Sequence, residues 1–309
     1  MNIRLLFKTA SGQYTYQNEL LSFSFRKDAY LPYTVLNAKL RCSSDIPKNS
    51  CEVSLYIGNK LLHHGTIDTL TETLSGGTSI ASFSSRGFTS MLDQNQIEPG
   101  LKFNISFNQL MDSFYPLPYI THENNSDSSG YIYVDKNSTM WDSIVNLAYR
   151  QCGRYPYIRD DNCVRITPVP QPAVFSYNNS QLLSVGSEIS DKRLISHFHM
   201  ANMSGEYGEY ELEDTDVVNA KIVRHHYLDL DMEFLRDPQD ALFFRDKYAF
   251  RARKRFFCSY SGYNGEDISD IVTFQNIISQ RIAAVSVRGS QRGVITEISV
   301  YEDKFPRDP

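Results

Sequence analysis

The chain has 309 residues, of which 31 are Lys or Arg and 36 are Asp or Glu, so its formal net charge is −5. This charge argues against a general nucleic-acid binder and against a protein held on an anionic membrane by charge. Hydrophobic residues make up 41% of the chain and charged residues 22%, which is typical of a folded globular protein, and the length predicts about two domains.

The first residues and the cysteines bear on the compartment. Residues 1–12 contain an apolar run of only three residues, and no stretch reaches the 18 apolar residues of a membrane span. The five cysteines are odd in number, and no two are spaced as C-x-x-C. We therefore expect free thiols in a reducing cytoplasm, no secretory leader and no membrane anchor.

The N-terminal hundred residues alternate between apolar and polar positions with period two. This pattern predicts strands with one buried and one solvated face, at 21–25, 34–42 and 53–57. Gly58-Asn59 suits a two-residue hairpin turn into a long strand over 61–74. Ser75-Gly76-Gly77 then turns the chain into another strand. Residues 1–104 are therefore predicted to form a first barrel-like β domain.

The pattern changes to helices at residue 105. Ser106 is placed to cap a short helix, and Thr139 with Asp142 makes a capping box for a longer one that Gly153 ends. Trp141 begins the apolar stripe of that second helix. A small hairpin is expected at 156–167, and three prolines follow it, so residues 105–172 are predicted to form a small α/β domain.

Strand patterns return over 173–309, the predicted second β domain. Strands are expected at 194–200 and 221–231, and Asp237-Pro238 predicts the start of a helix over 237–250. A hairpin over 285–300 with a turn at 289–293 ends the chain. The predicted fold class is mainly β with a small α/β insert (α+β). No internal repeat is visible by identity, although the two β regions share a pattern.

No catalytic, cofactor-binding or metal-binding motif is recognisable. The chain contains no G-x-S-x-G, P-loop, H-E-x-x-H or EF-hand pattern, and Gly76-Gly77 is interpreted as a hairpin turn rather than a phosphate loop. We therefore predict no catalytic residue, no cofactor and no metal ligand, and the chain is not expected to be an enzyme.

Histidines occur in three close pairs, at 63–64, 197–199 and 225–226. The H-x-H at His197 and His199 puts two rings on one face of a strand, as a metal site requires. No cysteine or third histidine lies near this pair in sequence. The favoured interpretation for all three pairs is a solvated or subunit-facing surface.

Two runs of like charge stand out. The acidic run is Glu206, Glu209, Glu211, Glu213, Asp214 and Asp216. The basic run is Arg245, Lys247, Arg251, Arg253, Lys254 and Arg255. The acidic run is interpreted as a solvated loop or charged interface rather than a pair of glycosidase carboxylates. The basic run, with aromatics nearby, is interpreted as a helix end with contacts to a neighbouring chain rather than a nucleic-acid patch.

Three segments carry a resemblance to a known family. Segment 61–96 has a glycine entering a long strand (Gly65), a turn, a second strand, the pair Arg86-Gly87 and a "D-L"-like segment. Segment 137–170 has a capped helix, a glycine stop and a two-stranded hairpin, and 184–205 is a weaker match. In this order they resemble baseplate hub proteins of contractile phage tails. That family includes late control D proteins and the hub portion of type VI secretion spike proteins.

The resemblance implies a structural role. Hub proteins of this type are homotrimers in which each chain gives two tube-like antiparallel β-barrel domains. The resulting pseudo-sixfold ring joins a sixfold tail tube to a threefold central spike. The implied partners are a tail tube protein above, a spike below and other baseplate proteins, within a virion or tail-like particle assembled in the bacterial cytoplasm. No nucleic-acid specificity is implied.

Two departures from the family pattern are present. Arg86-Gly87 reverses the common Gly-Arg order, and the sequence stops at Pro309 without a β-helical spike extension. The resemblance then implies that the spike is a separate polypeptide.

Two alternatives stay open at the level of sequence. One is a carbohydrate- or cell-wall-binding β module that uses its many Tyr side chains as platforms, although the single Trp argues against it. The other is a wall hydrolase that uses the acidic run.

Overall fold

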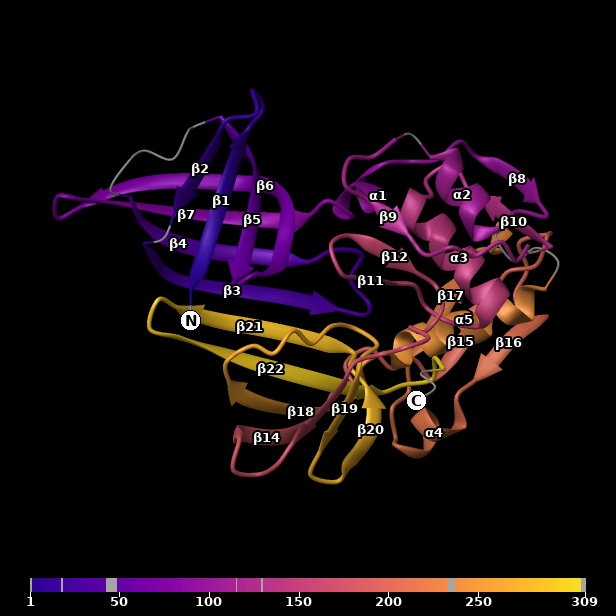
Figure 1. Cartoon of the computed structure of the whole chain (residues 1–309). Helices are drawn as coiled ribbons and strands as arrows, with labels where there is room; N and C mark the ends of the chain where they lie inside the picture. Colours follow the sequence, from indigo (N-terminus) through magenta and orange to yellow (C-terminus); the bar gives the residue numbers. More distant parts are fainter. Residues whose placement is uncertain are drawn as a thin grey trace.

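A computed structural model describes residues 2–17, 19–42, 49–114, 116–128, 130–232 and 237–306. The chain is mainly β, and the described residues also contain five helices, which confirms the predicted fold class. The magenta and orange elements lie together on one side of a large sheet (Figure 1).

The large sheet has eleven strands in the order β14-β18-β22-β21-β3-β4-β7-β6-β5-β1-β2, and all its pairs are antiparallel. Its N-terminal strands are β1 (Ile3–Thr9), β2 (Tyr14–Gln17), β3 (Leu20–Asp28), β4 (Val35–Cys42), β5 (Ser50–Ile57), β6 (Lys60–Ser75) and β7 (Thr78–Gly87). Its C-terminal strands are β14 (Leu182–Ile189), β18 (Lys254–Ser261), β21 (Ala284–Ser290) and β22 (Gly293–Glu302). The predicted turns at Gly58-Asn59 and Gly76-Gly77 are confirmed.

The two predicted β regions are joined edge to edge. β3 pairs with β21 from Ala284↔Asp28 to Gly289↔Phe23, which places indigo and yellow strands side by side (Figure 1). One hydrophobic core takes buried side chains from both regions, among them Phe25 and Phe83 from the first and Ile298 from the second. The apolar positions of the period-two pattern therefore share a single core.

The sheet also contains a repeat of topology that the sequence hides. Four strands of the N-terminal half have the spatial order β6-β7-β4-β3, with β5, β1 and β2 beyond β6, and the C-terminal half has the order β21-β22-β18-β14. If the four strands of each set are numbered in chain order, both sets have the spatial order third, fourth, second, first. The halves follow one another head to tail, so β21 is equivalent to β6 and β14 is equivalent to β3.

A helical unit follows β7. Its elements are α1 (Ser90–Gln94), β8 (Gly100–Phe103), α2 (Phe107–Ser113), β9 (Thr121–His122), β10 (Tyr131–Val134), α3 (Met140–Cys152), β11 (Tyr157–Arg159) and β12 (Cys163–Arg165). The predicted caps are confirmed, because Ser106 and Thr139 each form a capping box and Gly153 ends α3 with φ of 64°. α1 was not predicted.

The remaining elements divide between two places. They are β13 (Val174–Tyr177), β15 (His197–Met200), β16 (Tyr210–Glu213), α4 (Thr215–Asn219), β17 (His225–Leu228), α5 (Pro238–Phe250), β19 (Ile271–Phe274) and β20 (Ile277–Arg281). β13, β19 and β20 form a small sheet whose Tyr177, Val272 and Phe274 join the core of the large sheet. β15 and α5 pack instead with α3 in a second core.

Predicted elements in this region differ in extent. The strand expected over 221–231 is confined to β17, because only His225–Leu228 pair with the four residues of β15. The helix expected over 237–250 is confirmed as α5, with Asp237 accepting a hydrogen bond from the Asp240 amide. The domain boundaries at 104 and 172 stay a prediction, although residues of β15 and α5 share a core with the predicted α/β unit.

The close approach of β6 and β7 explains two glycines. Gly65 and Gly87 are direct cross-strand partners. A Cβ on Gly65 would overlap the carbonyl group of Arg86, and one on Gly87 would lie 2.6 Å from Thr34 Oγ1. The reversed Arg86-Gly87 order therefore places a glycine opposite Gly65, at a position where Thr34 leaves no room for a Cβ.

Gly65→Ala is expected to lower the free energy of unfolding by roughly 1–3 kcal/mol, because the new methyl group forces β6 away from β7. Urea denaturation followed by circular dichroism measures the effect. Gly293→Ala is the matched control, since nothing lies within 4 Å of a Cβ built there. Equal stability of the two variants would contradict the close approach.

Candidate functional site

The strongest surface feature is the face of the large sheet that turns away from its core. On this face polar side chains, all of them short except Lys39, form two cross-strand rows over β3, β4, β7 and β6. One row is Ser24, Asn37, Ser84 and Thr69; the other is Ser22, Lys39, Ser82 and Thr71. Together they line a shallow recess of about 550 Å³. The alternating pattern thus gives one apolar and one hydroxyl-rich face.

The polar face continues across the junction of the two halves. Arg26 on β3 is opposite Ser286 on β21, and Ser286 is opposite Glu297 on β22. Arg255 forms an ion pair with Glu297, and its Nε donates a hydrogen bond to Ser299 Oγ over 2.8 Å. These residues line a second recess of about 330 Å³. One continuous polar surface therefore spans strands from both ends of the chain.

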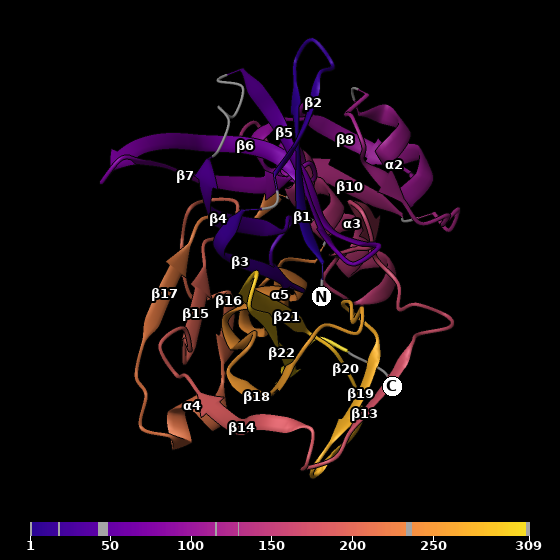
Figure 2. The ribbon, with the colours of Figure 1, turned by 60° about the vertical axis from the view of Figure 1, so that its left-hand side comes forward.

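The sheet also has free edges. β14 pairs only with β18, and β6 beyond Thr66 has no partner on the side of β5, among the described strands. β6 and β7 extend together beyond the rest of the sheet, and β14 is the last strand at one end of the sheet order (Figures 1 and 2). Leu183 and Ile189 on β14 and Leu74 on β6 are 59%, 62% and 76% exposed. Unpaired edges with exposed apolar side chains are typical of strands that pair with another chain.

His63 and His64 do not share a solvated surface, so the prediction is wrong for His63. His63 is buried, and its ring nitrogens contact Thr34 Oγ1 and Ser85 Oγ at 2.8 Å. Burial lowers the pKa of His63 to about 3. Burial also disfavours the charged form of His64, but hydrogen bonds with Asp161 and Glu52 outweigh it and raise the pKa of His64. Period-two alternation along β6 separates the two rings.

The H-x-H of β15 acquires a third histidine through strand pairing. Parallel pairing puts His225 of β17 opposite His197, and the two rings stack at 4.3 Å. His199 Nε2 lies 2.9 Å from His225 Nδ1, and its Nδ1 lies 3.0 Å from Glu211 Oε1. The rings lie side by side or stacked rather than around a common point. Within the described residues, no three His, Cys, Asp or Glu are arranged to hold a metal ion.

Members of both charged runs form ion pairs with other residues of the same chain. In the acidic run, Glu211 contacts His199 and Asp214 contacts Lys304 over 2.7 Å. In the basic run, Arg253 pairs with Asp191 and Lys254 with Glu302, each over 2.8 Å. Since carboxylates of the same chain hold these cations, the expected contact of the basic run with a neighbouring chain is not required by the structure.

Further observations concern cysteines and membranes. Cys51, Cys152, Cys163 and Cys258 are free thiols, and the side chain of Cys42 lies outside the described residues. No helix in the described part of the chain is long and apolar enough to span a bilayer.

Comparison with known proteins gives matches at the level of structure. No family model and no curated protein sequence matches the chain. A tail protein from Neisseria meningitidis MC58 superimposes with a TM-score of 0.71 at 13% identity, covering 99% of this chain and 98% of that one. The 43 kDa tail protein of prophage MuSo2 from Shewanella oneidensis gives 0.67 at 13% identity, covering 96% and 97%.

A third match comes from a secretion system. The E. coli c3393 protein, a type VI secretion component described as similar to the T4 tail proteins gp27 and gp5, gives a TM-score of 0.54 at 7% identity. It covers 94% of this chain and 76% of that one. Over nearly its whole length, the chain therefore has the fold of phage tail proteins.

Proposed function

We propose that this chain is the structural baseplate hub of a contractile tail or tail-like injection particle. Three copies would form a pseudo-sixfold ring between a sixfold tail tube and a threefold spike. The proposed role is assembly and force transmission, without bond chemistry. The full-length likeness in fold to tail proteins supports the tail role.

The observation that carries the ring proposal is the repeated topology of the large sheet. Each half contains a set of four strands in the same order, and the two sets are joined head to tail through β21 and β3. Three chains then supply six equivalent four-stranded units. A head-to-tail contact that closes after three chains gives a cyclic ring.

The same repeat predicts the contact between subunits. Since β21 is equivalent to β6 and β14 to β3, the internal β21–β3 pairing has an external counterpart between β6 and β14 of adjacent chains. The free edges support this assignment, because β14 and the part of β6 beyond Thr66 lack partners among the described strands on those sides. Their exposed Leu183, Ile189 and Leu74 would be buried in the contact.

The polar face gives the ring a suitable inner wall. Ser, Thr and Asn side chains in the two rows of β3, β4, β7 and β6 are short and expose hydroxyl and amide groups. A polymer moving past these rows meets mainly hydroxyl and amide groups. We therefore place this face toward the lumen of the ring.

The test is the solution mass of the purified chain by light scattering. A trimer of 35.4 kDa chains has a mass of about 106 kDa. Leu183→Glu with Ile189→Glu is expected to reduce the mass to that of the monomer, because two charges would be buried in the β6–β14 contact.

Val174→Glu with Ile278→Glu is the matched control. Val174 and Ile278 are 71% and 68% exposed, at least as much as Leu183 and Ile189. They lie on β13 and β20, outside the proposed contact. This control should stay trimeric. A wild-type monomer at every concentration would refute the ring, and a trimer that tolerates the β14 substitutions would refute the assigned edge.

A further inference from the structure

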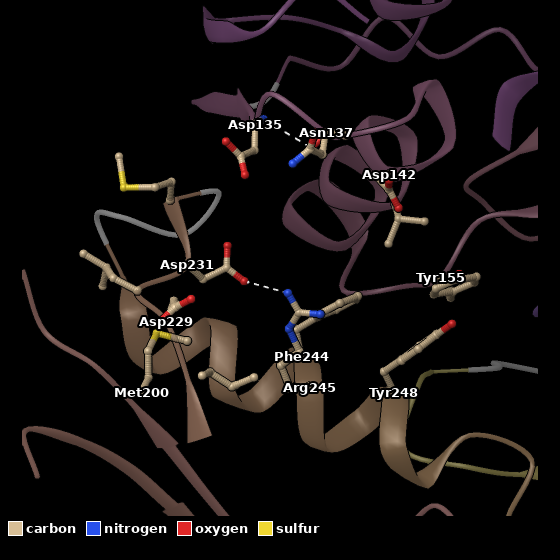
Figure 3. A pocket seen from close by; sticks show the side chains of 15 residues that line it. Asp135, Asn137, Asp142, Tyr155, Met200, Asp229, Asp231, Phe244, Arg245 and Tyr248 are labelled. Atoms are coloured by element: carbon tan, nitrogen blue, oxygen red, sulfur yellow. Dashed lines mark hydrogen bonds and ion pairs between the residues drawn. The ribbon is translucent and has the colours of Figure 1, made fainter. Parts of the chain in front are cut away.

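A pocket of about 490 Å³ lies outside the surfaces used above. One wall comes from α3 and the loop that precedes it, and the other comes from the end of β17 and from α5 (Figure 3). The two walls belong to segments far apart in the sequence.

The floor of the pocket is apolar. Val145 of α3, Leu228 of β17 and Phe244 of α5 line it, together with the rings of Tyr155 and Tyr248. Val145 and Phe244 belong to the second core, so the floor is a rigid part of the fold. Such a floor accommodates methylene groups of a ligand.

The rim carries an excess of negative charge. Asp135 and Asp142 lie on one wall, and Asp229 and Asp231 lie on the other. Arg245, the one cation among the described lining residues, is held by Asp231 over 3.0 Å. Asp142 is engaged in capping α3. No ion pair joins Asp135 or Asp229 to a described cation.

We propose that this pocket docks a basic segment of a partner protein. An Arg or Lys of that segment would place its cation between Asp135 and Asp229 and its methylene stem on the apolar floor. The cation would supply a counter-charge to a rim whose described residues include four aspartates and one arginine, whereas an acidic or neutral segment would not. The site uses neither the edges nor the polar face of the large sheet, so it is independent of the proposed ring.

The test uses a labelled peptide, fluoresceinyl-Gly-Arg-Leu-Arg-Gly-amide, and fluorescence anisotropy at low ionic strength. Asp135→Asn with Asp229→Asn is expected to weaken binding by about tenfold, since two charge contacts are lost. Both side chains are exposed, so the substitutions leave the fold intact, as circular dichroism would verify.

The matched control is Glu19→Gln with Glu72→Gln, which makes the same change in net charge at two exposed positions, one just before β3 and one on β6. Its affinity should stay within about twofold of wild type, since remote charges are screened. Equal weakening in the two double variants would overturn the proposal, because attraction would then depend on net charge alone. It would also be overturned if spermidine binds through Asp135 and Asp229 while the peptide fails to compete.

Discussion

Asp267→Ala is expected to lower the free energy of unfolding by about 3–5 kcal/mol, because it leaves Lys27 buried without a counter-charge. Lys27 Nζ lies 2.7 Å and 3.0 Å from the two carboxylate oxygens of Asp267, and its side chain is only 6% exposed. The Asp267 carboxylate also accepts a hydrogen bond from the backbone N–H of Asp160 over 2.7 Å. One carboxylate thus ties β3, the turn after β11 and the loop before β19 together.

Asp68→Ala is the matched control for this prediction. Asp68 forms an ion pair with Arg86 over 2.8 Å, but both side chains are about 30% exposed. Loss of an exposed pair costs at most about 1 kcal/mol. Urea denaturation of both variants gives the comparison. The role assigned to Asp267 as the counter-charge of buried Lys27 would be wrong if Asp267→Ala were no more destabilising than Asp68→Ala.

A double substitution separates the loss of the pair from the loss of packing. Lys27→Met with Asp267→Leu removes both charges together, and well-packed apolar replacements of a buried pair are often neutral. We expect this variant to recover most of the stability lost in Asp267→Ala. Recovery would identify the unpaired Lys27 charge, rather than the shortened side chain, as the cause.

Local features of the fold were predictable from the sequence because they depend on neighbouring residues. The capping boxes of Ser106 and Thr139, the stop at Gly153 and the start of α5 at Asp237 each involve groups within a few positions of one another. Period-two alternation likewise identified the strands, since one apolar face suffices to produce it.

Contacts between distant segments were not predictable in this way. The β3–β21 pair joins residues about 260 positions apart, and neither strand carries a local mark of its partner. Similarly, His225 meets His197 only because β17 pairs in parallel with β15. His63 was misassigned because adjacent strand residues face opposite sides, so a His-His pair always has one ring on each face.

The candidate site was less predictable than the fold. The serines and threonines of its polar face were visible as the polar half of each alternating strand, yet nothing in one strand indicates that four such halves adjoin. The repeated strand order has the same origin, since it exists in the pairing and not in residue identity. The function proposed above would reside in strand edges and sheet faces, which single-sequence motifs do not describe.

Trp141→Ala is also expected to cost about 3–5 kcal/mol, since it removes the largest side chain of α3 from a packed core. Trp141 is 3% exposed, and its ring meets that of Tyr155 with centroids 6.4 Å apart. This core joins α3 to β15 and α5, and it is distinct from the core of the large sheet. The substitution should therefore first destabilise the part of the molecule formed by α3, β15 and α5, called the helical side below.

Scanning calorimetry distinguishes local from global loss. If the two cores unfold separately, Trp141→Ala should lower the transition of the helical side while leaving that of the large sheet near its wild-type temperature. Phe243→Ala on α5 is the control, because Phe243 is 45% exposed and its truncation leaves little cavity. An unchanged melting profile for Trp141→Ala would mean that the indole contributes nothing to this core. A shift of both transitions together would show that the two cores unfold as one cooperative unit, as the proposed transmission of force would require.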